Sequence, residues 1–195
     1  LAQSGGQVLD LEGLANHRGS LLGQEWAQAG EAAPDPQPSQ KYFETRVLEQ
    51  LQRFDSARPI WVESESSKIG KVYVPVQLWQ QFKAAPGLEI ALPLAVRVQG
   101  LIEQYPHLIA HPAFLKGKLE RLRGRYGSLT VNQWFDWIEA GDWSTFVADL
   151  LTTHYDPAYR RSLQQHFPQV TAQLSLTDLG LAEVERAIAQ LQRLT

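Results

Sequence analysis

Hydrophobic residues along the chain occur in two patterns, as short runs and at helical spacing. The short runs lie at residues 8–11, 59–63 and 88–92, and each predicts a strand. Between the first two runs, Phe43, Val47 and Leu51 recur at the spacing of a helix, for which Ser39 is the predicted N-cap. Strands that alternate with helices indicate an α/β layer with parallel strands.

The connections between these elements have clear signals of their own. Residues 77–85 predict a helix that ends at a Pro-Gly pair, and Pro93 leads into a helix that carries Arg97. Residues 1–6 have the pattern of the last turn of a helix closed by glycine. Three alternate prolines in residues 21–38 predict an extended loop, because proline cannot continue a helix or a central strand.

The pattern changes after Pro106. Residues 111–155 show helical spacing and no convincing strand, with three helical patterns at 114–122, 129–138 and 146–151. Tryptophans recur at this spacing, and we expect them to pack in a core rather than to stack on nucleotide bases: Trp134, Trp137 and Trp143.

The last part of the chain predicts a return to the sheet. Asp156 and Pro157 have the pattern of an N-cap and first turn of a helix. A strand is expected at residues 170–176, followed by an amphipathic helix over 178–194 that is capped by Thr177 or Asp178. We therefore expect three parts, which are an α/β core over 1–105, a helical subdomain over 106–168, and a return strand and C-terminal helix over 169–195.

Composition narrows the function classes. The 195 residues are 44% hydrophobic and 20% charged, as in an ordinary globular protein, and the net charge of −3 gives no whole-chain reason to bind nucleic acid. No apolar run approaches the roughly 18 residues of a membrane span, and no signal peptide pattern is present. We expect a cytoplasmic protein with no membrane partner.

Two residue types are missing altogether. The chain has no cysteine, which excludes disulfides, a thiolate nucleophile and cysteine-based zinc sites within it. It also has no methionine, and it opens on the pattern of a helix end. We expect it to be a fragment of a longer protein.

Acids follow the first two predicted strands. Asp10 and Glu12 alternate with apolar residues and are expected on one side of the first strand tip, and Glu63 and Glu65 follow the second strand. Mg²⁺ is usually bound by one or two carboxylates together with substrate phosphates, so these tips suit a magnesium–phosphate site with Asp10 as metal ligand. No G-x-x-x-x-G-K-[ST] sequence is present to bind the phosphate. The alternative is that Asp10 only caps the following loop.

A polar loop follows the first strand, with Asn16, His17 and Arg18 in a row. An amide, an imidazole and a fixed cation within one turn suit a site, although a solvated connection is the alternative. We expect Arg18 to lower the pKa of His17 and keep its ring neutral near pH 7.

One basic concentration stands out, formed by Lys116, Lys118, Arg121, Arg123 and Arg125 and opposed only by Glu120. Such a stripe could bind phosphates of a nucleic acid in a salt-sensitive way, or it could be a solvated helix face. The histidines at 107, 111, 154 and 166 have no metal-ligand spacing, and we expect no zinc or iron site.

Residues 10–20 read Asp-Leu-Glu-Gly-Leu-Ala-Asn-His-Arg-Gly-Ser and closely resemble the tRNA 2-selenouridine synthase family. Two further segments agree in order and spacing, namely Gln-Pro-Ser-Gln at 37–40 followed by Phe43-Glu44, and residues 62–70 followed by Val74-Pro75. Leu150-Leu151 and residues 155–159 match a more diffuse C-terminal pattern of that family. The resemblance is strong over residues 7–75 and loose thereafter.

The resemblance implies an enzyme that replaces the sulfur of wobble 2-thiouridine in tRNA with selenium. The same enzyme would also geranylate that sulfur. Its substrates would be selenophosphate and geranyl diphosphate, and Mg²⁺ is a candidate cofactor. The full protein would join an N-terminal rhodanese domain, which carries the essential cysteine, to a P-loop domain. The fold class expected here is α/β, an incomplete P-loop NTPase-like parallel sheet without its first strand, Walker A loop and first helix, plus an all-helical subdomain.

The resemblance also suggests roles for individual residues. Catalytic roles are expected for Asp10, Glu12 and Glu65. Contacts with phosphate or tRNA are expected for Asn16, His17, Arg18, Gln37, Ser39, Gln40, Lys68, Arg97, Lys116, Lys118 and Arg121. The sequence departs from the family at Ser64, where an acid is usual, and at Ser67, where an arginine is frequent. These two departures weaken a direct catalytic role for that segment.

We therefore expect part of a tRNA-modifying transferase that is inactive when isolated, because selenium transfer needs a cysteine. One alternative is a nucleotide or small-molecule kinase-like P-loop protein without an RNA role. Another is a helical interaction module in which the α/β half is only a scaffold. The alternatives differ in whether the chain binds tRNA and whether the strand tips bind phosphate.

Overall fold

The computed structural model describes residues 1–23, 36–63, 66–167 and 169–193. The chain divides into two compact units. Unit 1 contains Leu1–Gly87, Phe167–Thr171 and Leu181–Thr195, and unit 2 contains Leu88–His166 and Ala172–Gly180.

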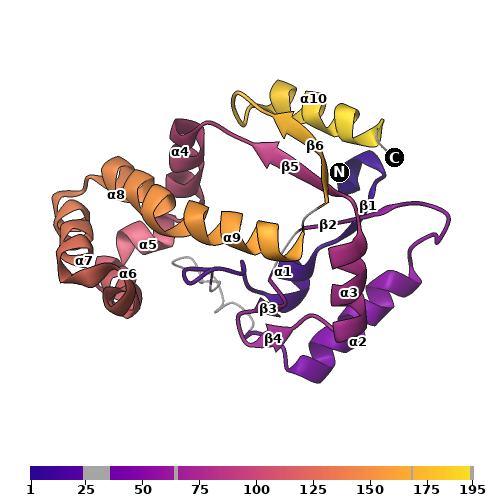
Figure 1. Ribbon diagram of the computed structural model, residues 1–195, viewed down its shortest axis with the longest axis horizontal. Helices are drawn as coiled ribbons and strands as arrows, with labels where there is room; N and C mark the ends of the chain where they lie inside the picture. Colours follow the sequence, from indigo (N-terminus) through magenta and orange to yellow (C-terminus); the bar gives the residue numbers. More distant parts are fainter. Residues whose placement is uncertain (24–35, 64–65, 168, 194–195) are drawn as a thin grey trace. The chain divides into compact units, whose positions relative to one another are not determined.

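Unit 1 contains the two predicted N-terminal strands. β1 (Gln7–Leu9) pairs in parallel with β2 (Ile60–Val62), with Gln7 opposite Ile60 and Leu9 opposite Val62 (Figure 1). The Gln7 side chain holds the turn that precedes β2. Its Nε2 donates to Asp55 O at 3.1 Å, and its Oε1 accepts from Asp55 N–H at 2.6 Å. The predicted parallel pairing of these strands is confirmed.

Two helices of unit 1 begin at side-chain caps. Asp10 caps α1 (Leu11–Ala15) by accepting the Gly13 N–H at 2.7 Å, and Ser39 caps α2 (Gln40–Gln52) by accepting the Tyr42 N–H at 3.3 Å. The predicted cap at Ser39 is confirmed. The prediction that the first strand reaches residue 11 is wrong, because the Asp10 cap turns the chain into a helix. The short helix at the N-terminus, η1 (Ala2–Ser4), ends as expected at a glycine, Gly5, with φ 85°.

A hairpin completes the core of unit 1. β3 (Lys68–Ile69) and β4 (Val72–Tyr73) pair antiparallel, and α3 (Val76–Ala84) follows them at the predicted position. The sequence predicted only a turn and an extended piece here. The hairpin shares one buried cluster with β1, α1 and α2, which consists of Leu9, Leu11, Ala15, Phe43, Val47, Ile69, Val72 and Val74.

The third predicted strand is paired differently from our expectation. β5 (Gly87–Ala91) pairs with β6 (Val170–Ser175), the predicted late strand. Gly87 N–H donates to Gln169 O at one end and Leu176 N–H donates to Ala91 O at the other, so the two strands run in parallel. Within the described residues, the expected single sheet is therefore replaced by three two-stranded sheets, two of them parallel. The predicted combination of helices with parallel strands is confirmed.

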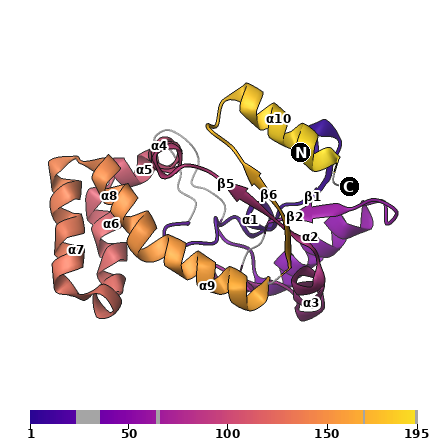
Figure 2. The same ribbon diagram turned by 45° about the horizontal axis from the view of Figure 1, so that its top comes forward.

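Unit 2 is mainly helical (Figure 2). Its helices are α4 (Leu94–Gln104), α5 (Pro106–Ala110), α6 (Pro112–Leu119), the 3₁₀ turn η2 (Glu120–Leu122), α7 (Arg123–Ala140) and α8 (Trp143–Leu150). Gly127 interrupts α7 with φ 82° and ψ 166°, values that favour glycine. Trp134 is fully buried, as predicted, whereas Trp137 and Trp143 are only partly buried.

A continuous helical segment follows α8. It passes through a π-helical turn, η3 (Leu151–Tyr155), directly into α9 (Asp156–His166). The predicted N-cap at Asp156 is therefore wrong, and this carboxylate instead forms an ion pair with Arg97 of α4. Proline lacks an N–H and its ring clashes with the carbonyl four residues earlier, so the wider π turn provides room for Pro157 inside the helix.

The compact units differ from the expected parts at 1–105, 106–168 and 169–195. Unit 2 begins at Leu88 because α4 packs against α8 and is tied to α9 through Arg97 and Asp156. A helix that the sequence assigned to the α/β core thus belongs with the helical unit.

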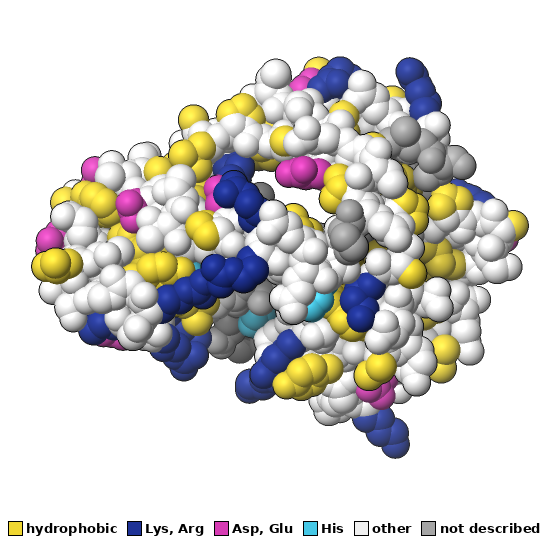
Figure 3. All heavy atoms as spheres, viewed as in Figure 1, with side chains coloured by type: hydrophobic (Ala, Val, Ile, Leu, Met, Phe, Trp, Pro, Cys, Tyr) yellow, Lys and Arg dark blue, Asp and Glu magenta, His cyan; other side chains and the backbone are white. Residues whose placement is uncertain are grey.

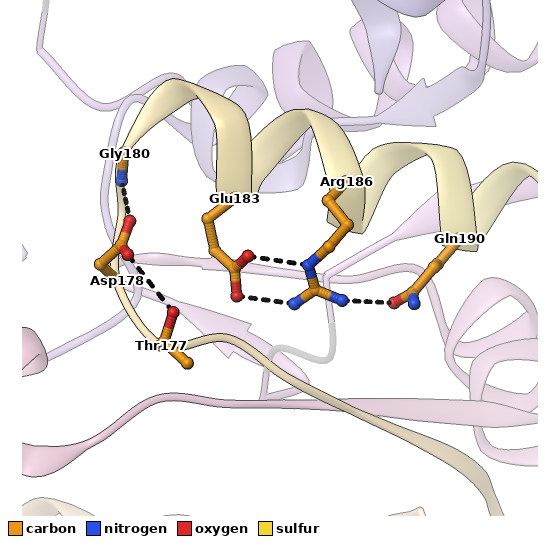
Figure 4. A network of polar contacts seen from close by, with 6 residues as sticks. All are labelled: Thr177, Asp178, Gly180, Glu183, Arg186 and Gln190. Carbon is orange, nitrogen blue, oxygen red and sulfur yellow. Dashed lines mark hydrogen bonds and ion pairs between the residues drawn. The ribbon is translucent and has the colours of Figure 1, made fainter.

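The last helix, α10 (Leu181–Gln192), is stabilised by polar pairs along one side (Figure 4). The Arg186 guanidinium donates to both Glu183 carboxylate oxygens and to Gln190 Oε1 at 3.2 Å. Asp178 accepts the Gly180 N–H at 2.7 Å in the turn before the helix. Since α10 begins at Leu181, neither Thr177 nor Asp178 is its N-cap, contrary to our expectation. No described helix is both long and apolar enough to cross a membrane.

Candidate functional site

The tips of β1 and β2 bring two carboxylates together. Leu9 and Val62 are opposite each other in the parallel pair, so Asp10 and Glu63 are the next residues at the same edge. The carboxyl ends of parallel strands are the edge at which α/β proteins bind ligands. The acids that directly follow the first two predicted strands, Asp10 and Glu63, therefore lie at one edge of the parallel pair.

Glu63 lies against the first turn of α1. Its Oε1 accepts the Glu12 N–H at 2.8 Å, which ties the end of β2 to the helix that follows β1. Burial raises the pKa of Glu63 above its ordinary value of 4.5, the backbone hydrogen bond from Glu12 opposes this rise, and the negative charge of Asp10 adds to it. Glu63 therefore holds its proton more tightly than an ordinary exposed glutamate does.

The other two predicted acids have different positions. Glu12 lies within α1, not on the strand, so Asp10 and Glu12 do not share a strand face as we expected. Glu65 lies outside the described residues. Glu63 was not among the residues to which we assigned catalysis, although its position directly after the β2 run was the signal that could have identified it.

The raised pKa of Glu63 predicts a pH dependence of stability. Because the native state binds this proton more tightly than the unfolded chain, the contribution of Glu63 to stability is greatest below 4.5 and is lost as the pH rises through the raised pKa. Glu63→Gln cannot ionise, and its amide oxygen can still accept the Glu12 N–H. We expect the stability of this variant relative to the wild type to increase between about pH 4 and about pH 7.

Urea unfolding across this pH range measures the difference. Glu49→Gln, on the exposed face of α2, is the matched control. A stability difference between Glu63→Gln and the wild type that is constant with pH, or that decreases as pH rises, would contradict the assignment.

The polar loop after α1 is folded back on itself. Asn16 has φ 48° and ψ 48°, the left-handed conformation in which asparagine is tolerated at a helix end. Arg18 N–H donates to Gly23 O at 2.7 Å, and a Cβ at Gly23 would lie 2.7 Å from the Arg18 carbonyl carbon, so only glycine fits there. The His17 Nδ1 atom is shielded from solvent. The expected pKa and ligand roles of Asn16, His17 and Arg18 stay predictions.

The predicted Gln-Pro-Ser-Gln residues support the hairpin. Gln37 donates to Ile69 O at 2.8 Å and accepts from Lys71 N–H at 2.7 Å, while Gln40 donates to Tyr73 O and accepts from Tyr73 N–H, both at 2.8 Å. Both side-chain amides therefore form hydrogen bonds with the backbone of the β3–β4 hairpin. Their expected contact with phosphate or tRNA stays a prediction, as does that of Ser39, whose hydroxyl caps α2.

Of the remaining predicted cations, Lys68 lies on β3 of unit 1 and the others belong to unit 2. Arg97 pairs with Asp156, Lys116 with Glu139, and Arg123 with Glu120. Lys118 lies 5.0 Å from the Phe114 ring, and Arg125 lies 5.3 Å from the Tyr126 ring. Arg121 and Arg125 are exposed. The basic stripe is thus partly neutralised by the neighbouring Glu120 and by the more distant Glu139, and its exposed charges lie around η2 and the start of α7.

Sequence reasoning missed one polar contact in unit 2. The Tyr126 hydroxyl lies 2.9 Å from His154 Nδ1, and His154 belongs to the π turn η3. Burial, together with the positive charge of Arg125, lowers the pKa of His154 below 6.5. Neither the π turn nor the approach of two residues 28 positions apart has a signal in a single sequence.

The acids at the strand tips are of the residue type that Mg²⁺ takes as ligands together with a phosphate. Asp10 and Glu63 supply two carboxylates, and Mg²⁺ commonly takes one or two and completes its shell with water and phosphate oxygens. Among the described residues, no group of three or more acidic, histidine or cysteine side chains could hold a metal by itself.

Comparison with known sequences identifies the family. The sequence profile of the tRNA 2-selenouridine synthase AAA domain matches residues 1–182. The chain belongs to this family. The two parallel strands that end before Asp10 and Glu63 therefore belong to the tRNA 2-selenouridine synthase AAA domain.

Individual relatives agree with the family assignment. The chain is 30% identical to the tRNA 2-selenouridine synthase of Alcanivorax borkumensis, over 89% of this chain and 53% of the relative. It is 31% identical to that of Marinobacter nauticus, over 80% of this chain and 48% of the relative. The chain thus spans about half the length of the curated relatives it matches. No solved structure matches it significantly.

Proposed function

We propose that this chain supplies the phosphate- and tRNA-binding part of an enzyme that converts wobble 2-thiouridine in tRNA to 2-selenouridine. The reaction would use selenophosphate and pass through a sulfur geranylated from geranyl diphosphate. The family match over residues 1–182 is the observation that carries this proposal. A rhodanese domain would supply the cysteine that the chain lacks, and the enzyme would act on tRNA in the cytoplasm.

The strand-tip edge is the proposed diphosphate site. Asp10 and Glu63 would hold Mg²⁺, which when bound neutralises charge on the phosphate oxygens. Because the half-buried Glu63 carboxyl has a raised pKa and a metal ligand must be ionised, Mg²⁺ binding there would compete with the proton. Glu12, Glu65, Asn16, His17 and Arg18 are proposed as neighbours of the ligand because they follow the same two strands. The 195 residues alone would not transfer selenium, because they contain no cysteine.

The basic stripe of unit 2 is the proposed contact with the tRNA backbone. In Figure 3, dark-blue Lys and Arg side chains lie over the lower ends of α6 and α7 and along α9. Because Arg121 and Arg125 are exposed, we assign the main phosphate contacts to them and to the neighbouring Lys118. Such contacts release counterions from the RNA and are weakened by salt.

Salt-dependent tRNA binding tests the proposal. The Lys118→Ala, Arg121→Ala, Arg125→Ala triple variant is expected to bind tRNA more weakly and to reduce the slope of log affinity against log salt by up to about three, since each lost phosphate contact removes about one. Fluorescence anisotropy of labelled tRNA over a salt series measures both quantities.

The matched control removes three exposed cations of unit 1, as Lys41→Ala, Arg53→Ala, Arg193→Ala. It changes the net charge equally and is expected to retain most of the slope. Equal slopes for both triple variants would contradict the stripe as a specific contact. Phosphate-ligand binding by a chain that binds no tRNA would support the kinase-like alternative.

A further inference from the structure

The β3–β4 hairpin has one buried face and one exposed face. Ile69 and Val72 are 0% and 1% exposed and anchor the hairpin in the core of unit 1. Lys68, Lys71 and Tyr73 are all exposed, and Tyr73 retains 51% of its accessible surface. The hairpin therefore presents an aromatic ring and two cations from a well-anchored element.

The two glutamines of the preceding segment hold this hairpin in place. Gln37 bonds both sides of the turn, and a Cβ at Gly70 would lie 2.3 Å from Gln37 Oε1. Gly70 has φ +59°, the conformation expected at the first central residue of a type II′ turn. Gln40 occupies both backbone polar groups of Tyr73, so the outer edge of β4 at that residue is already satisfied. A further strand therefore cannot pair with the backbone of Tyr73. Only the Tyr73 side chain remains available to contact a ligand.

Lys68 and Tyr73 are directly opposite in the hairpin. Because the Tyr73 backbone bonds Gln40 rather than Lys68, this is a non-hydrogen-bonded pair, in which side chains approach most closely. The Lys68 Nζ lies 5.2 Å from the centre of the Tyr73 ring. The six residues from 68 to 73 contain two lysines and no acid, so the charge of the face suits a polyanion.

We propose that this exposed face is a stacking surface for an unpaired nucleotide of RNA. The Tyr73 ring contacts the base, and Lys68 and Lys71 lie near the flanking phosphates. An aromatic side chain beside a positive track is the arrangement by which proteins bind single-stranded nucleic acid. The inference rests on the proposed tRNA role, and it adds to unit 1 a contact with unpaired bases that the cationic stripe of unit 2 does not provide.

Binding measurements on the whole chain test the surface, with labelled tRNA and a single-stranded oligonucleotide as probes. Tyr73→Ala is expected to weaken binding of both by about 5- to 100-fold, the usual range for losing one stacked base, whereas Tyr73→Phe retains the ring and should bind nearly as the wild type does. Lys68→Ala and Lys71→Ala should each reduce the salt slope by about one.

The chain offers matched controls for both residue types. Tyr42 on α2 is 58% exposed and has Arg46 5.9 Å from its ring, so Tyr42→Ala tests whether any exposed tyrosine gives the same loss. Lys41→Ala is the control for the lysines. Thermal unfolding of each variant shows whether the fold is retained. A loss of binding in a folded variant can then be attributed to the missing side chain.

Equal binding by Tyr73→Ala and Tyr42→Ala would overturn the inference, as would a loss in Tyr73→Phe as large as in Tyr73→Ala. If tRNA binding nevertheless keeps its dependence on Lys118, Arg121 and Arg125, the proposed function stands and the hairpin face serves a partner other than RNA. A wild-type chain that binds no tRNA overturns both proposals.

Discussion

Replacing Trp134 by alanine is expected to lower the free energy of unfolding by about 3–5 kcal/mol, as for other large-to-small changes of buried aromatic residues. The Trp134 side chain is 0% exposed, and its ring packs edge-on against Tyr126 with 5.8 Å between ring centres. Its indole N–H donates to the Asp149 carboxylate at 2.7 Å, so truncation also removes a hydrogen bond from a half-buried acid. Urea unfolding followed by circular dichroism measures the loss.

Leu129→Ala is the matched control for this change, because Leu129 lies on the same helix and is 89% exposed. Its effect is expected to stay within about 0.5 kcal/mol, as for most surface substitutions. Comparable losses for Trp134→Ala and Leu129→Ala would show that Trp134 does not organise the core of unit 2.

Replacing Phe43 by alanine is expected to cost unit 1 about 3–5 kcal/mol. Phe43 is 0% exposed and belongs to the cluster shared by β1, α1, α2 and the β3–β4 hairpin. The cavity would therefore loosen the strand tip with Asp10 and the hairpin with Tyr73 at once. Urea unfolding measures the cost, and amide hydrogen exchange at Ile69 and Val72 reports whether the hairpin opens more often.

Leu48→Ala on the same helix is the control, since Leu48 is 56% exposed. We expect less than about 0.5 kcal/mol from it. If Phe43→Ala lowered stability without increasing exchange in the hairpin, the shared core would not couple the two proposed ligand-binding elements.

Local patterns predicted the elements well. The runs before Asp10 and Glu63 predicted β1 and β2, and their acids do meet at one edge. The Ser39 cap, the glycine at the end of η1 and the burial of Trp134 were also predicted. Each of these features depends on a few neighbouring residues, or on the periodic burial of one face, which a single sequence contains.

The errors arose where a distant partner decides the outcome. Asp156 has the local pattern of an N-cap, but Arg97 pairs with it inside a continuous helix. The pairing of β5 with β6 joins segments more than 80 residues apart. Propensity is a weak prior in each case, because tertiary contacts override it.

The sequence by itself determined the family motifs, the positions of most helices and strands, and the acids that follow the first two strands. Only the tertiary structure decided that Glu63 is held by α1 with a raised pKa and that Gln37 and Gln40 brace the hairpin under Tyr73. The physical reason is that burial, pKa and hydrogen-bond partners depend on what surrounds a side chain in space. The order of residues along the chain specifies those surroundings only through the complete fold.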